Sequence, residues 1–262
     1  MDIANNLDAL RHRYLDLMEL SLANAIYGES RVEMTLRATL QRLRHPYLTR
    51  RGALRWPARA HTMIGPLRLR HLRELVQQTI EDDIPGDYLE AGVWRGGACI
   101  MMRAVLAAYG VSDRLVFCAD SFAGLPRPNS RRFPYDKPDH LFRFSDLVVS
   151  EDEVRRNFER YGLLDDQVIF LKGFFRDTLP KAPISELAVL RLDGDMYQST
   201  IETLEALYDK VSPGGFVVID DYGGLENCRA AVHDFLAARA LMPKIVPVDE
   251  TCVWWQKPGT AT

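Results

Sequence analysis

"LAVLRLDGDMYQST", residues 187–200, is the stretch that decides the fold. A run of apolar or long side chains ends at Asp193, and a second carboxylate follows Gly194 at Asp195. A near-continuous apolar run of this length predicts a strand that is buried on both faces, as strands of parallel sheets are. In such sheets, ligands bind beyond the carboxyl ends of the strands. The two aspartates therefore lie where a functional site is expected.

From residue 85 onward, apolar runs of this kind alternate with helical patterns. Ser150, with Glu153 three residues later, has the spacing of a capping box at the start of a helix. This alternation predicts an α/β fold whose parallel sheet is covered by helices on both faces. Strands are predicted at 86–93, 114–122, 167–173, 187–195, 214–222 and 252–257, and helices at 98–110, 150–163 and 226–240.

The first 80 residues have a different sequence pattern. Leu7, Leu10, Leu15 and Met18 recur at helical spacing, and a helical pattern resumes over 66–80. Between them, "HPYLTRRGALRWP" (45–57) contains proline and glycine and predicts a loop. We therefore expect a helical N-terminal extension over 1–80 and the main domain over 81–262. Residues 123–150 are rich in proline and charge and predict a second, longer loop.

Composition excludes several classes of protein. The 262-residue chain has a net charge of -3 and a pI near 6.1, which argues against binding to nucleic acid or to an anionic membrane surface. No apolar run approaches the roughly 20 residues that span a bilayer. The N-terminus carries acidic residues and lacks the apolar core of a signal peptide, so we expect a cytoplasmic protein. Cys99 and Cys118 lie in apolar context and are expected to be reduced core residues.

Acidic residues also follow other predicted strands. Glu90 precedes a turn in which Gly92 and Gly96 would let the backbone approach a ligand closely, although the GxGxxG pattern of nicotinamide-binding proteins is absent. The next strand ends in Asp120, where a carboxylate can take both ribose hydroxyls of an adenosine. A single acid at a strand end can also cap a helix or face water. The pair at this spacing favours a nucleoside site.

Asp220 and Asp221 follow the strand after Asp193, so their carboxylates are expected to converge with it at one edge of the sheet. Carboxylates within a few ångströms of one another either raise a pKa or hold a cation. Oxygen ligands favour magnesium or calcium. No histidine or cysteine lies at the spacing of zinc ligands.

Long motifs in the chain have a family resemblance. They are "AHTMIG" (60–65), "LEAGVWRGGACI" (89–100), "CADSFAGLP" (118–126), "RRNFERYGLLDDQVIFLKGFFRDTLP" (155–180), "LRLDGDMYQST" (190–200) and "VSPGGFVVIDDY" (211–222). With these motifs the chain resembles, from about Tyr14 to Trp255, the macrocin O-methyltransferase family, which includes the mycinamicin and novobiocin sugar O-methyltransferases. The resemblance implies a class I methyltransferase fold, a doubly wound, mostly parallel seven-stranded sheet with an N-terminal helical lid. It also implies the use of S-adenosylmethionine and Mg²⁺.

The resemblance assigns roles to individual residues. Asp193, Asp220 and Asp221 are similar to the family's metal ligands, and Asp195 is similar to the general base, although the roles of Asp193 and Asp195 could be exchanged. Residues 123–150 match the family poorly and are expected to vary with the substrate. The expected cofactor contacts are Met63, Ile64, Glu90, Gly92, Trp94, Gly96, Asp120, Ser121, Gly173 and Phe174.

The expected activity is methylation of a sugar hydroxyl on a small-molecule glycoside, with S-adenosylmethionine and Mg²⁺. A catechol-type O-methyltransferase acting on a small aromatic diol is the alternative, since vicinal oxygens chelate magnesium in either acceptor. A cofactor-binding protein without turnover is a third reading, which the intact aspartates oppose. We also expect a homo-oligomer, taken as a dimer.

The aromatic residues of the N-terminal third have two readings. The stretch with Tyr27 and Glu29 and the loop 45–57 could fold over the acceptor as a lid that excludes water. Tyr47 and Trp56 could stack on a glycoside aglycone, or could be packing or interface residues. His61 could be a site residue near this lid, or a surface or hydrogen-bonded core residue.

Overall fold

The sheet confirms the predicted fold class. The computed structural model describes residues 3–28 and 56–259. In these residues a seven-stranded sheet has the order β3-β2-β1-β4-β5-β7-β6. β7 is antiparallel to its neighbours β5 and β6, and the strands from β3 to β5 are parallel to one another. The strands are β1 (Asp87–Ala91), β2 (Val116–Asp120), β3 (Val168–Lys172), β4 (Leu187–Leu192), β5 (Val211–Ile219), β6 (Val246–Pro247) and β7 (Val253–Gln256).

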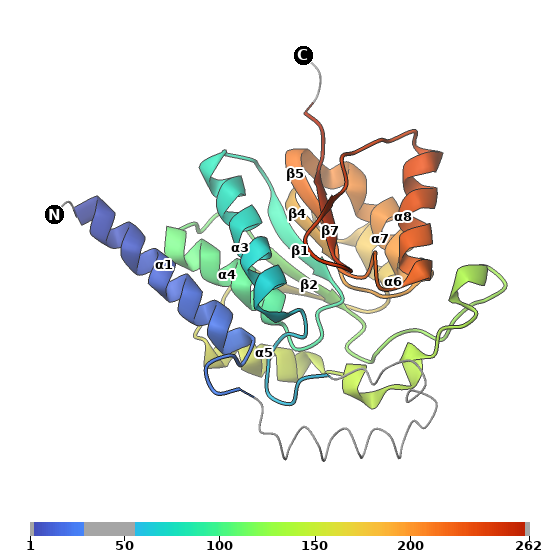
Figure 1. The fold of residues 1–262 in the computed structure, drawn as a ribbon, viewed down its shortest axis with the longest axis horizontal. Helices are drawn as coiled ribbons and strands as arrows, with labels where there is room; N and C mark the ends of the chain where they lie inside the picture. Colours follow the sequence, from blue (N-terminus) through green and yellow to red (C-terminus); the bar gives the residue numbers. More distant parts are fainter. Residues whose placement is uncertain (1–2, 29–55, 260–262) are drawn as a thin grey trace.

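Helices cover both faces of this sheet (Figure 1). α1, α3 and α4 lie on one side, and α7 and α8 lie on the other. The strand order reverses direction between β1 and β4, which makes the ends of these two strands a topological switch point, where ligands of α/β proteins bind. The helices are α1 (Ile3–Leu22), α3 (Gly65–Glu81), α4 (Gly97–Tyr109), α5 (Glu151–Arg160), α6 (Phe175–Thr178), α7 (Tyr197–Leu207) and α8 (Glu226–Ala238).

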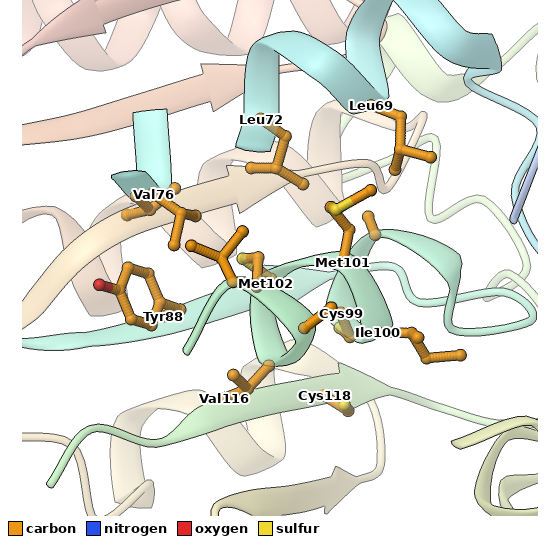
Figure 2. Packing of buried hydrophobic residues seen from close by; sticks show 14 of the residues in the cluster. Leu69, Leu72, Val76, Tyr88, Cys99, Ile100, Met101, Met102, Val116 and Cys118 are labelled. Atoms are coloured by element: carbon orange, nitrogen blue, oxygen red, sulfur yellow. The ribbon is translucent and has the colours of Figure 1, made fainter. Parts of the chain in front are cut away.

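Two apolar cores, one on each face, follow from the alternation of side chains along the strands. On β1, Tyr88 faces the core under α3 and α4, whereas Leu89 and Ala91 face the core under α7 and α8. Figure 2 shows the first of these cores, in which Leu69 and Leu72 of α3 point toward methionines of α4. The packing fixes the sheet between two helical layers and leaves the strand ends open.

The N-terminal helix α1 packs on α3 and α4, and two of its acids form ion pairs with α3. Asp16 contacts Arg73 at 2.5 Å, and the buried Glu19 contacts Arg70 at 2.8 Å. Both helices contribute apolar side chains to the same core as α4. The predicted lid positions Glu29 and Tyr47 lie outside the described residues. The lid, and the division at residue 80, stay predictions.

The segment 123–150 contains three short 3₁₀ turns, at Pro134–Asp136, Leu141–Arg143 and Ser145–Leu147, and is a long loop as predicted. The next helix begins as predicted, since the Ser150 hydroxyl accepts a hydrogen bond from the Glu153 N–H at 3.2 Å. The cysteine prediction is confirmed as well, because Cys99 and Cys118 are free and buried. A membrane-spanning helix is absent from residues 3–28 and 56–259, whose helices lack the necessary combination of length and apolar composition.

Candidate active site

A cavity of about 400 Å³ opens at the carboxyl ends of the parallel strands. Its polar part includes aspartates at the carboxyl ends of β2, β4 and β5. The other polar lining residues are Arg68, Ser121, Gln198, Ser199, Glu202 and Thr251. Its apolar part comes from segments far apart in the sequence, including the 123–150 loop. These apolar lining residues are Trp56, Met63, Trp94, Leu125, Pro126, Leu141, Leu147, Phe174, Phe175 and Leu225. The cavity thus combines an apolar wall with a strongly acidic floor.

Three carboxylates meet at this floor. Asp193 follows β4, and Asp220 and Asp221 follow β5, and one oxygen from each lies within 4.8 Å of the others. Asp195 adds a fourth carboxylate to the cavity lining, because the chain turns sharply there with a φ of 60°. Its backbone N–H donates to the Asp221 carboxylate at 3.2 Å. The oxygen-only donor set of the three aspartates suits a hard divalent cation such as Mg²⁺.

Two arginines hold the carboxylates of Asp193 and Asp220 in place. Arg191, which is 1% exposed, donates from Nη1 to Asp193 at 2.8 Å and from Nη2 to one oxygen of Asp220. Arg68 of α3 donates to the other oxygen of Asp220 at 2.6 Å. Arg68 also bridges to Asp249 and Thr251 in the turn before β7. Both carboxylate oxygens of Asp220 therefore accept hydrogen bonds from arginines, and Arg68 connects α3 to the floor of the cavity.

The acidic floor carries more negative charge than its arginines neutralise. Burial and the charge of Asp193 raise the pKa of Asp220 to about 6, against the opposing effect of Arg191 and Arg68. Burial and the neighbouring aspartates also raise the pKa values of Asp195 and Asp221 well above the ordinary value. Groups with such raised pKa values gain free energy from an added positive charge. The floor therefore favours the binding of a cation.

The turn after β1 is built around the end of β4. Gly92 has a φ of 97°, and a Cβ atom at this position would lie 1.8 Å from the backbone oxygen of Asp193. The Asp120 carboxylate connects this turn to the turn after β2, since it accepts hydrogen bonds from the backbone N–H groups of Val93 and Phe122, both at 2.8 Å. The close approach that glycine permits here is thus to the protein's own backbone.

The structure places the predicted cofactor residues in two groups. Those that line the cavity are Met63, Gly92, Trp94, Asp120, Ser121 and Phe174, together with the four aspartates of the floor. Those outside the lining are Ile64, Glu90, Gly96 and Gly173. Glu90 is 2% exposed and contacts Arg191 and Cys99. A Cβ atom on Gly96 would meet Val154 of α5.

The predicted residues of the N-terminal third also differ in whether they line the cavity. Trp56 lines the cavity and packs on Phe144 of the 123–150 loop, with ring centroids 5.2 Å apart. Tyr27 is 87% exposed and is not part of the cavity wall. His61 forms a hydrogen bond with the Tyr161 hydroxyl at 2.9 Å, which makes it a hydrogen-bonded packing residue.

Sequence reasoning missed several residues that support the site. Arg191 is a charged residue inside an otherwise apolar strand, two positions before Asp193, and that pattern was the available signal. Asp136 is fully buried and accepts hydrogen bonds from the backbone N–H groups of Tyr197 and Gln198 at the start of α7. No local pattern marks Asp136 or Arg68, because their partners lie far along the chain.

Comparison with known proteins identifies relatives along most of the chain. The model of the macrocin O-methyltransferase (TylF) family matches residues 11–257. The chain is similar to an 8-demethyl-8-(2,3-dimethoxy-α-L-rhamnosyl)-tetracenomycin-C 4′-O-methyltransferase of Streptomyces olivaceus, with 47% identity over 94% of this chain and 93% of the relative. It is also similar to the demethyldecarbamoylnovobiocin O-methyltransferase of Streptomyces niveus, with 46% identity over 93% of each chain.

A solved structure agrees with these sequence matches. The O-methyltransferase NovP superimposes with a TM-score of 0.84 and 45% identity, covering 95% of this chain and 99% of the other. The match of the family model and the full-length similarity to relatives show that this chain belongs to the macrocin O-methyltransferase family and is an O-methyltransferase.

Proposed function

We propose that the protein is an O-methyltransferase that depends on S-adenosylmethionine and Mg²⁺ and methylates a sugar hydroxyl of a glycosylated natural product. The observation that carries the proposal is the convergence of Asp193, Asp220 and Asp221 at the floor of the cavity. The name of the tetracenomycin relative gives a substrate that carries a rhamnosyl group and a 4′-O position of methylation, which supports a sugar acceptor.

The residues present fit a divalent cation. Asp193, Asp220 and Asp221 would hold it, because each can direct an oxygen to a common point. In the described part of the chain, the Asp221 carboxylate accepts only one hydrogen bond, from the N–H of Asp195, so it has oxygen lone pairs to spare. When bound, a cation of this kind supplies Lewis acidity that lowers the pKa of an alcohol and orients its oxygen.

The rest of the cavity fits S-adenosylmethionine. The cofactor supplies a methyl group on a positively charged sulfur, and the excess negative charge of the floor favours that charge. Asp120 and Ser121 at the end of β2 line the cavity and would meet ribose hydroxyls, and Phe174, which is 36% exposed, would offer a ring face for the adenine. Trp94 is fixed in the wall by a hydrogen bond from its Nε1 to the backbone oxygen of Asp146 at 2.9 Å.

Asp195 is the better placed of the two candidate bases. The Asp193 carboxylate already accepts a hydrogen bond from Arg191 at 2.8 Å, whereas no hydrogen bond reaches the carboxylate of Asp195 from the described residues. Burial and the charges of Asp193 and Asp139 raise the pKa of Asp195, which makes its carboxylate a stronger base. Asp195 would take the proton of the acceptor hydroxyl at a carboxylate oxygen while the apolar wall excludes water.

Two kinds of measurement test the proposal. EDTA should abolish methyl transfer, and added Mg²⁺ should restore it. Asp221→Ala should lose magnesium-dependent activity while calorimetry shows unchanged binding of S-adenosylmethionine. Asp195→Asn should keep both affinities and lower kcat by at least about 100-fold, the usual contribution of a general base. Activity that is indifferent to the chelator would remove the metal from the proposal.

Acceptor profiling tests the substrate class. We expect turnover with a rhamnosylated aglycone and none with a simple catechol, because the apolar wall suits an aglycone, which a simple catechol lacks. Methylation of the catechol alone would reverse the assignment and make the protein a catechol-type enzyme.

A further inference from the structure

Glu90 and Arg191 form a buried ion pair across two neighbouring strands. They are register partners in the β1–β4 pairing, and the residues beside them in the same row, Cys118 of β2 and Val218 of β5, belong to the apolar core under α4. Arg191 is 1% exposed and Glu90 is 2% exposed. Burial of two charges in an apolar row costs free energy that the pair only partly recovers, so the pair calls for an explanation beyond stability.

The geometry separates Glu90 from the cavity. Its carboxylate accepts hydrogen bonds from Arg191 Nη1 and from the Cys99 thiol, the latter at 3.0 Å, and it does not line the cavity. A bound small molecule at the floor would meet Asp193 and Asp220 before it reached Glu90. The sequence motif suggests Glu90 as a cofactor contact, but its carboxylate contacts Arg191 and Cys99 of the protein itself.

Arg191 points from this row toward the cavity floor. Its Nη1 donates to both Glu90 and Asp193, and its Nη2 donates to Asp220. One planar guanidinium thus connects the ends of β1, β4 and β5. Without it, the carboxylates of Asp193 and Asp220 would repel each other across the few ångströms that separate them.

We propose that Glu90 and Arg191 are positioning residues, which preset the spacing of the Asp193 and Asp220 carboxylates for a divalent cation, and that Glu90 is not a contact of S-adenosylmethionine. This inference rests on the proposed function, since it assigns a cation to those carboxylates. Glu90 acts through Arg191: it fixes the plane of the guanidinium, and the guanidinium fixes the two carboxylates. A lysine at position 191 could not replace this fork, because a single ammonium group has no planar set of donors.

Calorimetry on the full chain tests the proposal with two separate titrations. The affinity for Mg²⁺ is measured without cofactor, and the affinity for S-adenosylmethionine is measured in EDTA. Arg191→Lys and Glu90→Gln should each weaken Mg²⁺ binding by about 10- to 100-fold, the range found for residues that orient metal ligands. Both variants should bind S-adenosylmethionine within about threefold of the unaltered protein, a change under 1 kcal/mol.

Arg103→Lys is the matched control. Arg103 is another buried arginine that is paired with an aspartate, Asp165, but it lies on α4 and does not line the cavity. It should lower thermal stability and leave both affinities unchanged. Should Arg191→Lys fail to fold, Glu90→Gln decides alone, because it preserves the size of the side chain and removes only its charge.

Three results would overturn the inference. Folded variants with undiminished Mg²⁺ affinity would make the pair merely structural. A Glu90→Gln protein that loses more than about tenfold in cofactor affinity, with Mg²⁺ binding intact, would make Glu90 a cofactor contact after all. If the unaltered protein bound no divalent cation, the proposed function would fail as well, and this result is distinct from the other two.

Discussion

Replacing Gly92 by alanine is expected to damage the protein more than any ordinary glycine substitution. The added Cβ atom would lie 1.8 Å from the backbone oxygen of Asp193 and 2.6 Å from its backbone carbon. Since carbon and oxygen normally approach no closer than about 3.3 Å, the two chain segments would have to separate by roughly 1.5 Å. Both are held in the sheet edge by backbone hydrogen bonds, from Gly92 to Ala119 at 2.9 Å and from Asp193 to Ala91 at 2.8 Å.

A matched control separates the two contributions to the loss of stability, backbone strain and steric clash. Gly110 also has a positive φ, of 68°, but nothing lies within 4 Å of the place its Cβ atom would take. Gly110→Ala therefore measures backbone strain alone, which costs about 1–2 kcal/mol. Gly92→Ala adds the steric clash to this strain, and the sum should reach about 4 kcal/mol or more. In a chain of this size that is a fall in Tm of about 8–16 °C, against about 2–8 °C for the control.

Urea unfolding followed by circular dichroism gives the free energies of both variants, and magnesium calorimetry gives the state of the site. We expect Gly92→Ala to lose metal affinity as well, because the clash displaces the backbone that carries the Asp193 ligand. Equal destabilisation in the two variants, within about 1 kcal/mol, would show that the sheet edge yields easily. The explanation of Gly92 by close backbone approach would then be wrong.

Two further predictions concern residues outside the cavity floor. Asp136→Ala should cost about 2–3 kcal/mol in urea unfolding, because it removes the acceptor for the first N–H groups of α7 and leaves them buried without a partner. Asp136→Asn, which keeps a carbonyl oxygen, should cost less, and equal losses in the two variants would contradict this reading. His61 has its pKa lowered to about 4 by burial and by Arg160 and Arg95, so the unfolded chain binds a proton more readily than the folded one. Its contribution to stability is therefore complete above about pH 6.5 and declines as the pH falls toward 4, by about 1–2 kcal/mol after allowance for its partial exposure. Unfolding curves of His61→Gln should show a correspondingly weaker pH dependence over this range, and an unchanged dependence would show that His61 is not responsible.

Local pattern in the sequence was enough to predict six of the seven strands and the aspartates at the edge of the sheet, whereas the two-residue strand β6 was not predicted. Apolar runs mark the strands because both faces of a parallel sheet are buried, and each carboxylate directly follows such a run. The convergence of Asp193 with Asp220 and Asp221 needs only the rule that parallel strands end at the same edge. The assignment of an individual role to each residue came from the family resemblance rather than from the pattern.

Tertiary structure alone decided how these carboxylates are held. Glu90 and Arg191 lie 101 positions apart, and they meet because β1 pairs with β4 in one particular register. Asp136 caps a helix that starts 61 residues later, from a loop in which the sequence shows no regular pattern. A side chain's burial is encoded by its immediate neighbours, but its partners are set by the packing of strands and loops that are distant in the chain. For that reason the sequence could locate the aspartates at the edge of the sheet. The contacts of Arg191 that connect them became visible only in the folded molecule.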